Sequence, residues 1–302
     1  MDFRHLHYFT TVAKQQSFTK AAHKLHVSQP SLSKMVKALE DELGVTLIDR
    51  SGKQIQLTDA GMIVYKEATT ILHSLYDLSN SLYDLMNLKK GKIKIGIPPI
   101  VGTLFFPTII KSFRDAYPDI VIEMIEFGGA KVTKMVEVGE VDVGVIVLPI
   151  EENIFDITKL GGEPMKVVIH EDHPLSDQES LSLLDLKDDS FIIFHEDFAM
   201  HDLIYKECIK HGFAPNVAYK SSQWDFIAEM VAANLGVALF PTSICRKLYQ
   251  PSLKIKELKN YIPWQLAVIT RKNRYISFAT KTFIKHTVEA FQTGHNQNEY
   301  KL

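Results

Sequence analysis

The residues between Asp2 and Glu40 offer chemistry suited to a polyanion. No acidic residue occurs in this segment, although Asp and Glu account for 36 of the 302 residues of the chain. The same segment contains six lysines and arginines and four histidines. Clustered cations gain affinity for nucleic acid by displacing the counterions that its phosphates hold. The charge asymmetry therefore predicts a nucleic-acid-binding segment.

The charge of the whole chain hides this local excess. Residues 1–58 carry a net charge of +3 and the remainder −5, which together give the −2 of the chain. A length of 302 residues favours about two domains, and 46% hydrophobic residues are typical of a globular protein. Two cysteines are too few for a disulfide framework, and no segment resembles a signal peptide or a membrane span. We therefore expect a cytoplasmic protein without a membrane partner.

Three short helices are expected to position the cations. Apolar residues at three- and four-residue intervals predict a first helix that ends near Lys14. Ser17 is an N-cap candidate for a second helix that ends near His26, and Ser28 for a third helix that Gly44 ends. Two helices around a tight turn are typical of a helix-turn-helix, whose second helix enters the major groove of DNA.

A hairpin wing is expected after the third helix. Strand-like runs at 45–48 and 54–57 flank a short turn, where Arg50 and Lys53 supply two cations. The alternative is a solvated three-helix bundle with a basic face, which charge alone does not exclude. Charge, helix caps and wing agree, which favours DNA binding. The residues expected at base edges are Gln29, Ser31, Ser33 and Lys34, those expected at phosphates are Lys20, Lys24, Lys37, Arg50 and Lys53, and Ser28 and Pro30 complete the DNA-binding set.

A long amphipathic helix is predicted from Asp59 to about Leu88. Its apolar residues advance by four and three positions over about three heptads, as in a coiled coil. This pattern favours pairing with a second copy of the chain, as a dimer or tetramer; the alternative is packing against its own chain. The seam consists of Val64, Ala68, Ile71, Leu75, Leu78, Leu82 and Leu85.

Strands and helices alternate in the remaining two thirds. A βαβαβ order is predicted from strands at 93–97, 120–127 and 142–148 and helices at 103–117 and 131–138. Sheets of this α/β type bind ligands beyond the carboxyl ends of their strands. Further strands are predicted at 165–170, 191–194, 217–220, 237–240 and 264–271, and further helices at 200–211, 224–235 and 278–291.

The run SFTKAAHKLHVSQPSLSKMVKALEDELGVTLIDRSGKQIQLTDAG, residues 17–61, closely resembles the N-terminal signature of LysR-type transcriptional regulators. The paired alanines, the SQPS turn, the helix exit at Gly44 and the closing LTDAG stand at the spacing of that family. The resemblance implies that Gln29, Pro30, Ser33 and the cation at 34 lie against the groove. Lys34 and Lys53 stand where Arg is frequent, so we expect phosphate contacts there rather than bidentate guanine contacts.

The resemblance continues more weakly to the end of the chain and implies three parts. These are a winged helix-turn-helix DNA-binding domain (1–58), a linker and dimerisation helix (59–90), and a two-lobed α/β effector-binding domain of periplasmic-binding-protein type (91–302). Lobe 1 is expected at about 91–161 and 266–302, and lobe 2 at about 162–265. The implied partners are promoter or operator DNA, a small-molecule effector and a further copy of the chain, with RNA polymerase as another candidate. Transcriptional activation is the implied mode, and no cofactor is expected.

The resemblance places the effector site in the cleft between the lobes. Ile100 and the pair Gly128 and Gly129 stand where hydroxyl residues would be expected, so backbone N–H groups, with Thr103, predict a small carboxylate effector. The alternative is that the glycines only form a tight turn. The expected effector-binding residues are Pro99, Ile100, Val101, Gly102, Thr103, Gly128, Gly129, Phe198 and His201.

Three functions other than a small-molecule-responsive regulator are also considered. His and acidic residues at 170–173 and 195–202 suggest a metal site, and Cys208 and Cys245 suggest a thiol switch. An α/β enzyme with a DNA-binding head is the third. The sequence contains no HExxH motif, phosphate loop, GxGxxG after a strand or GxSxG elbow, which favours a binding protein over an enzyme.

Overall fold

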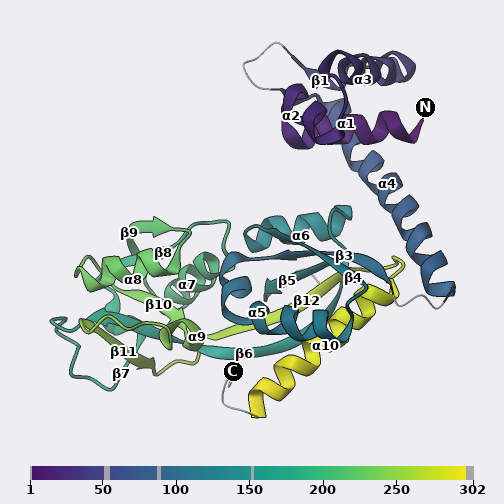
Figure 1. Cartoon of the computed structure of the whole chain (residues 1–302). Helices are drawn as coiled ribbons and strands as arrows, with labels where there is room; N and C mark the ends of the chain where they lie inside the picture. Colours follow the sequence, from purple (N-terminus) through teal and green to yellow (C-terminus); the bar gives the residue numbers. More distant parts are fainter. Residues whose placement is uncertain (1, 51–54, 87–89, 151–152, 297–302) are drawn as a thin grey trace. The chain divides into compact units, whose positions relative to one another are not determined.

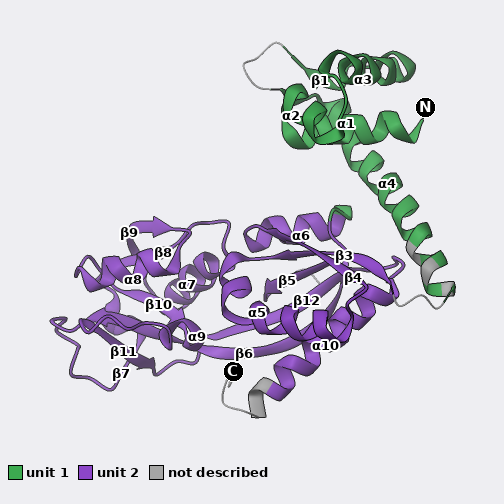
Figure 2. Cartoon of the chain, in the orientation of Figure 1, with its two compact units in different colours: residues 1–88, 138–140 green, residues 89–137, 141–302 purple. Residues whose placement is uncertain are grey.

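The computed structural model describes residues 2–50, 55–86, 90–150 and 153–296. The chain divides into two compact units (Figure 2): residues 1–88 with 138–140, and residues 89–137 with 141–302. None of the described helices is long and apolar enough to cross a lipid bilayer.

The first unit begins with three helices (Figure 1): α1 (Phe3–Gln15), α2 (Phe18–Leu25) and α3 (Gln29–Leu43). The predicted caps are confirmed. The hydroxyl of Ser17 accepts from the N–H of Lys20 at 3.3 Å, and that of Ser28 accepts from the N–H of Ser31 at 3.3 Å. Gly44 ends α3 at φ +69°, a left-handed conformation that glycine adopts at little cost.

The hairpin wing is present but shorter than predicted. Strands β1 (Ile48–Asp49) and β2 (Gln56–Leu57) pair antiparallel, with Ile48 opposite Leu57. Gln54 and Lys53 lie outside the described residues. Buried apolar side chains from all three helices and from β1 form one core, which includes Leu6, Phe9, Leu32, Val36, Leu39 and Ile48.

Helix α4 (Asp59–Leu85) carries the predicted seam, and its two halves differ. Ala68 is buried in the core of the first unit and Val64 packs against that core, so the N-terminal half packs on its own chain. Further along, Ile71, Leu75, Leu78 and Leu82 are 43%, 45%, 58% and 53% exposed. The side chain of Leu85 lies outside the described part. The N-terminal half therefore packs against its own chain. For the exposed C-terminal half, pairing with a second copy of the chain stays a prediction.

The second unit contains the predicted βαβαβ order. Strands β3 (Gly91–Ile97), β4 (Ile120–Glu126) and β5 (Val143–Val147) lie parallel in the order β4-β3-β5, joined by α5 (Pro99–Ala116) and α6 (Gly129–Val138). The central strand β5 is fully buried, as expected for a sheet covered by helices, whereas the edge strand β4 exposes Val121 and Met124. Helix α10 (Phe278–Asn296) packs against α5 through Phe283 and Phe113.

Two long strands join the two lobes of this unit. Strand β6 (Phe155–His170) pairs with β12 (Pro263–Arg271) as far as Pro164, and from Met165 onward it pairs with β10 (Ala238–Pro241) and β11 (Leu253–Leu258). The sequence predicted only the second part of β6. The first part contains two glycines and a proline, residues that are depleted in strands.

The second lobe contains the remaining elements. Strands β8 (Ser190–Phe194) and β9 (Asn216–Ser221) pair parallel and are followed by helices α7 (Ala199–Lys210) and α8 (Trp224–Ala232), respectively. The sequence did not predict β7 (Ser180–Leu181), the 3-10 helix η1 (Leu183–Leu186), α9 (Thr242–Cys245) or β11.

The start of α5 differs from the prediction. The helix begins at Pro99 rather than at Thr103, because proline fits the first helical position, where no N–H is needed. Thr103 consequently lies one turn inside the helix.

Candidate DNA-binding and effector-binding sites

One face of α3 combines five of the expected DNA-binding residues. At 100° per residue, the side chains at positions 29, 30, 33, 34 and 37 fall within about 140° of the helix circumference. The buried residues Leu32, Val36 and Leu39 lie on another side and hold the helix to the core. Ser31 is exposed but falls outside this face, so α3 does not group it with the other candidates. We call the grouped residues, Gln29, Pro30, Ser33, Lys34 and Lys37, the α3 face.

The lysines expected to meet phosphate are available to do so. Lys20, Lys24, Lys34 and Lys37 are exposed, and none forms an ion pair with a residue that the structure describes. A cation without a protein partner keeps its full charge for an approaching polyanion.

Arg50 differs from these lysines because it has partners within the protein. Its guanidinium Nη2 lies 2.9 Å from Glu40 Oε2, and the group stands 5.2 Å from the centre of the Phe18 ring. The other oxygen of Glu40 accepts hydrogen bonds from the backbone N–H groups of Leu47 at 2.9 Å and Ile48 at 3.1 Å. Arg50 and Glu40 therefore fix the first wing strand to α3. Lys53, the second expected wing cation, lies outside the described residues.

A cavity of about 160 Å³ opens between the two lobes of the second unit. It lies where two helices begin, at Gly129 of α6 and Ala199 of α7. Its lining from the first lobe includes Gly129, Thr133, Val147 and Pro149, and its lining from the second lobe includes Glu196, Asp197, Phe198 and Asp202.

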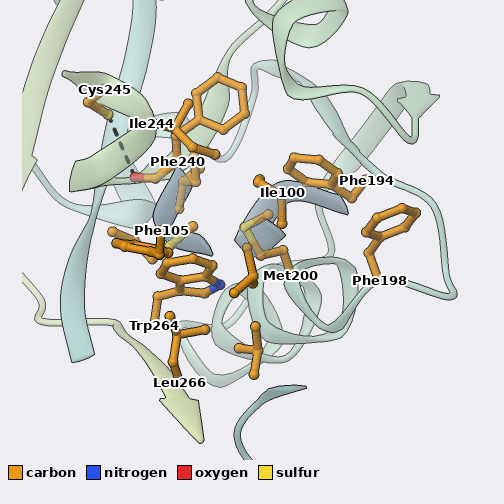
Figure 3. Close-up of a cluster of buried hydrophobic side chains, with 14 of the residues drawn as sticks. Ile100, Phe105, Phe194, Phe198, Met200, Phe240, Ile244, Cys245, Trp264 and Leu266 are labelled. Carbon is orange, nitrogen blue, oxygen red and sulfur yellow. Dashed lines mark hydrogen bonds between the residues drawn. The ribbon is translucent and has the colours of Figure 1, made fainter. Parts of the chain in front are cut away.

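A smaller recess of about 10 Å³ adjoins this cavity and shares Gly129, Val147, Phe198 and Ala199 with it. The other residues of the recess are Pro98, Ile100, Met200 and Trp264. Figure 3 shows Ile100, Met200 and Trp264 grouped there, with the indole nitrogen of Trp264 on the side toward Met200. The side chain of Trp264 is 0% exposed, and its Nε1–H has no hydrogen-bond partner.

The expected effector-binding residues divide into two groups. Ile100, Gly129 and Phe198 line the cavity or its recess. Val101 and Gly102 are buried within α5, and the remaining four, Pro99, Thr103, Gly128 and His201, do not line either space. His201 instead lies 3.1 Å from Asp202, through Nδ1.

Gly128 has a steric role that corrects its expected one. A Cβ atom at this position would lie 2.6 Å from the backbone oxygen of Asp197 and 2.9 Å from its Oδ2. Glycine therefore permits the loop after β8 to approach lobe 1 closely. A carboxylate already lies against Gly128, so this backbone is not an open site for an anion.

The charge of the cavity is negative. Glu196, Asp197 and Asp202 line it, and no lysine or arginine does so among the described residues. Two of the acids have cationic neighbours: Lys220 hydrogen-bonds to Glu196 and lowers the pKa of that carboxyl to about 2, and Lys206 lies 3.5 Å from Asp202. Asp197 has no ion-pair partner within the described part of the chain.

Two forces on an anion oppose each other in the cavity. Each helix N-terminus stabilises a nearby anion by about 0.3–1 kcal/mol. A full negative charge about 4 Å away destabilises it by about 4 kcal/mol at an effective dielectric constant of about 20. The carboxylates outweigh the helix termini unless all three are neutralised, so the lining does not favour the small carboxylate expected from the sequence.

The metal and thiol alternatives depend on histidine, acidic and cysteine side chains of the second unit. Among the described residues, no three His, Cys, Asp or Glu side chains gather as a set of metal ligands. Cys208 and Cys245 are both buried, and burial raises the pKa of each thiol to about 12. Thiols with such a pKa are protonated and unreactive at neutral pH.

Several lining residues were missed by the sequence reasoning, and some carried a usable signal. Pro149 follows β5, and Glu196 and Asp197 follow β8, so they stand at carboxyl ends of strands, where ligands bind in sheets of this type. Trp264 carried no such signal, since it lies within a strand.

Two family models match the chain. One, described as bacterial regulatory helix-turn-helix protein, lysR family, matches residues 3–62, and the other, described as LysR substrate binding domain, matches residues 87–292. The uncharacterized HTH-type transcriptional regulator YwbI of Bacillus subtilis (strain 168) is 48% identical over 288 residues, which cover 95% of this chain and 96% of that protein.

More distant matches extend over most of the chain. The hydrogen peroxide-inducible genes activator of Dickeya chrysanthemi is 28% identical over 263 residues, which cover 87% of this chain and 85% of that protein. A solved structure of a full-length OxyR variant from Pseudomonas aeruginosa has a TM-score of 0.74 at 27% identity and covers 97% of this chain and 95% of that one.

Proposed function

The chain belongs to the LysR family of DNA-binding transcriptional regulators, and on that premise we propose that it binds operator DNA through the α3 face as a dimer, under the control of a small molecule bound between the lobes of its second unit. The family consists of regulators rather than enzymes. The observation that carries the DNA-binding part is the α3 face itself, which lies beside the buried side of the helix and has two exposed lysines without an ion pair to any described residue.

The proposed dimer uses the C-terminal half of α4. Four apolar side chains of the heptad seam are exposed there over about three turns of helix, whereas the earlier seam residues are covered by the chain's own core. An exposed apolar stripe with coiled-coil spacing is stabilised by a second stripe of the same kind. A dimer would present two α3 faces to two half-sites of an operator.

The proposed sensor is the cavity between the lobes. Among the described elements, only β6 and β12 run from one lobe into the other, so a molecule that contacts both lobes favours one arrangement of them over others. Regulation then follows from the difference in affinity of the molecule for the two arrangements. A carboxylate effector has the support of two helix N-termini but must overcome the acidic lining.

Sensing of peroxide by thiols is not supported by this chain's cysteines. The relative from Dickeya is described as a hydrogen peroxide-inducible genes activator. Both cysteines here are buried and have raised pKa values, so neither has the exposed, thiolate character that peroxide chemistry needs.

The test is to select operator fragments from genomic DNA with the purified full-length protein and to compare two variants on them. Gln29→Ala should weaken binding to a selected fragment by about tenfold, through loss of a base contact, and leave binding to random duplex unchanged. Lys37→Ala should weaken both and lower the slope of log affinity against log salt by about one unit. Lys111→Ala, an exposed lysine of α5, is the matched control. Equal losses for both α3 variants on both duplexes would contradict the assignment.

A further inference from the structure

The recess beside Trp264 contains a hydrogen-bond donor without an acceptor. The indole ring is fully buried, and its Nε1–H has no partner. Buried donors are nearly always satisfied, because an unmet N–H loses its bonds to water on folding without replacement. The recess that Trp264 lines has room for about one heavy atom, since a water-sized probe needs about 10–15 Å³. The site is therefore built to receive an acceptor.

The acceptor that fits the recess is uncharged. The side chains around it are Pro98, Ile100, Val147, Phe198 and Met200, all apolar. An anion placed here would lose its hydration and gain one neutral donor, since no lysine or arginine among the described residues lines the recess. A carbonyl or hydroxyl oxygen loses far less hydration and makes the same bond. Trp264 thus selects a neutral oxygen.

The adjoining cavity has the opposite preference at its other wall. Glu196, Asp197 and Asp202 come from the loop after β8 and the first turn of α7, and Thr133 adds a hydroxyl. Lys220 and Lys206 offset part of this charge, whereas Asp197 has no ion pair within the described residues. A protonated amine satisfies such a wall, because its N–H groups donate to carboxylates.

We propose that the effector is a small amine with an uncharged carbonyl or hydroxyl oxygen at its other end, held by the indole N–H of Trp264 in the recess and by the carboxylates around Asp197 in the cavity. The proposal rests on the proposed function, since it names the ligand class of the same cavity. It replaces the carboxylate expected from the sequence.

The test applies four compounds of similar length to the full-length protein. N-acetylputrescine has an acetamide oxygen and an ammonium group; 4-acetamidobutanoate replaces the ammonium group by a carboxylate; N-butylacetamide has neither charge; hexylamine lacks the acetamide. Isothermal titration calorimetry should show N-acetylputrescine binding at least about tenfold more tightly than each of the other three, because each lacks one of the two contacts. Absence of saturable binding by N-acetylputrescine, or tighter binding of the carboxylate, overturns the proposal.

A spectroscopic measurement reports the predicted bond directly. The chain has two tryptophans, so protein labelled with 15N-tryptophan gives two indole N–H signals. Trp264→Phe assigns one of them, and Trp224→Phe, outside both spaces, assigns the other and is the matched control. N-acetylputrescine should shift the Trp264 signal downfield and leave that of Trp224 in place; an unmoved Trp264 signal at saturation overturns the role of the indole.

Two variants separate the ends of the ligand. Trp264→Phe should weaken N-acetylputrescine and N-butylacetamide alike, by about fivefold to tenfold, and spare hexylamine. Asp197→Asn should weaken the two amines and spare N-butylacetamide. The contrast among compounds in the unmodified protein gives the same answer if Trp264→Phe fails to fold.

DNA binding by the ligand-free protein tests the proposed function separately from the proposed ligand class. Selected-fragment binding without any response to the four compounds rejects the ligand class alone. Loss of selected-fragment binding in every condition rejects the proposed function.

Discussion

Replacing Glu40 by alanine should loosen the wing far more than replacing its ion-pair partner Arg50. One oxygen of Glu40 accepts from the N–H groups of Leu47 and Ile48, at 2.9 and 3.1 Å, and the other lies 2.9 Å from Arg50 Nη2. Leu47 and Ile48 are buried, so their N–H groups cannot turn to water when the carboxylate is removed.

The two kinds of contact differ in size. A hydrogen bond to a charged group contributes about 1.5–3 kcal/mol, and two of them set the cost of Glu40→Ala at about 3–4 kcal/mol after partial relaxation. The Arg50 side chain is 40% exposed, so its ion pair contributes at most about 0.5 kcal/mol, and its contact with the Phe18 ring about 0.5 kcal/mol more. Arg50→Ala should therefore cost about 1 kcal/mol. Glu40→Gln keeps a neutral acceptor for both N–H groups and should cost about 1–2 kcal/mol.

Amide hydrogen exchange of the peptide that covers residues 45–50 measures these costs directly. A loss of 3 kcal/mol corresponds to about a hundredfold decrease in protection, and a loss of 1 kcal/mol to about fivefold. Asp41→Ala, which removes the neighbouring exposed carboxylate of α3, should leave protection unchanged. Equal losses for Glu40→Ala and Arg50→Ala would show that the backbone bonds do not hold the wing, and would refute the reasoning.

Three further changes have definite expected outcomes. Leu78→Asp should turn the proposed dimer into a monomer in sedimentation equilibrium, since burying two leucines stabilises an interface by about 3–6 kcal/mol; a dimer that persists would exclude the α4 seam. Burial outweighs the hydrogen bonds from Ser243 and raises the pKa of Glu163, so the folded state holds this proton more tightly than the unfolded state and the stability it contributes is lost as pH rises. Glu163→Gln should therefore gain in melting temperature relative to the parent between pH of about 5 and 8; a difference independent of pH would contradict this. Cys208 and Cys245 should resist iodoacetamide at neutral pH, because at a pKa of about 12 only about one thiol in 10⁵ is ionised; rapid labelling in the folded protein would reopen the thiol switch.

Those features of this protein that depend on residues close together in the chain were predictable from the amino-acid pattern. Ser17, Ser28 and Gly44 cap helices through atoms three or four residues away, so these residues were sufficient to predict where α2 and α3 begin and where α3 ends. The heptad spacing of α4 and the βαβαβ order followed from the periodicity of apolar residues. The LysR resemblance rested on the same local patterns.

The surroundings of each functional side chain depend on tertiary packing and could not be predicted from the residues alone. Arg50 was read as a phosphate anchor, but the fold places it against Glu40, ten residues earlier. Gly128 was read as an anion site, but Asp197, from the other lobe, lies against it. No sequence pattern around Trp264 predicted a role for it. Its indole N–H lies without an acceptor beside the recess because β12 crosses between the lobes next to the first turns of α5 and α7. Contacts between different elements are set by the packing of whole elements, and the spacing of residues along the chain does not encode which side chains that packing brings together.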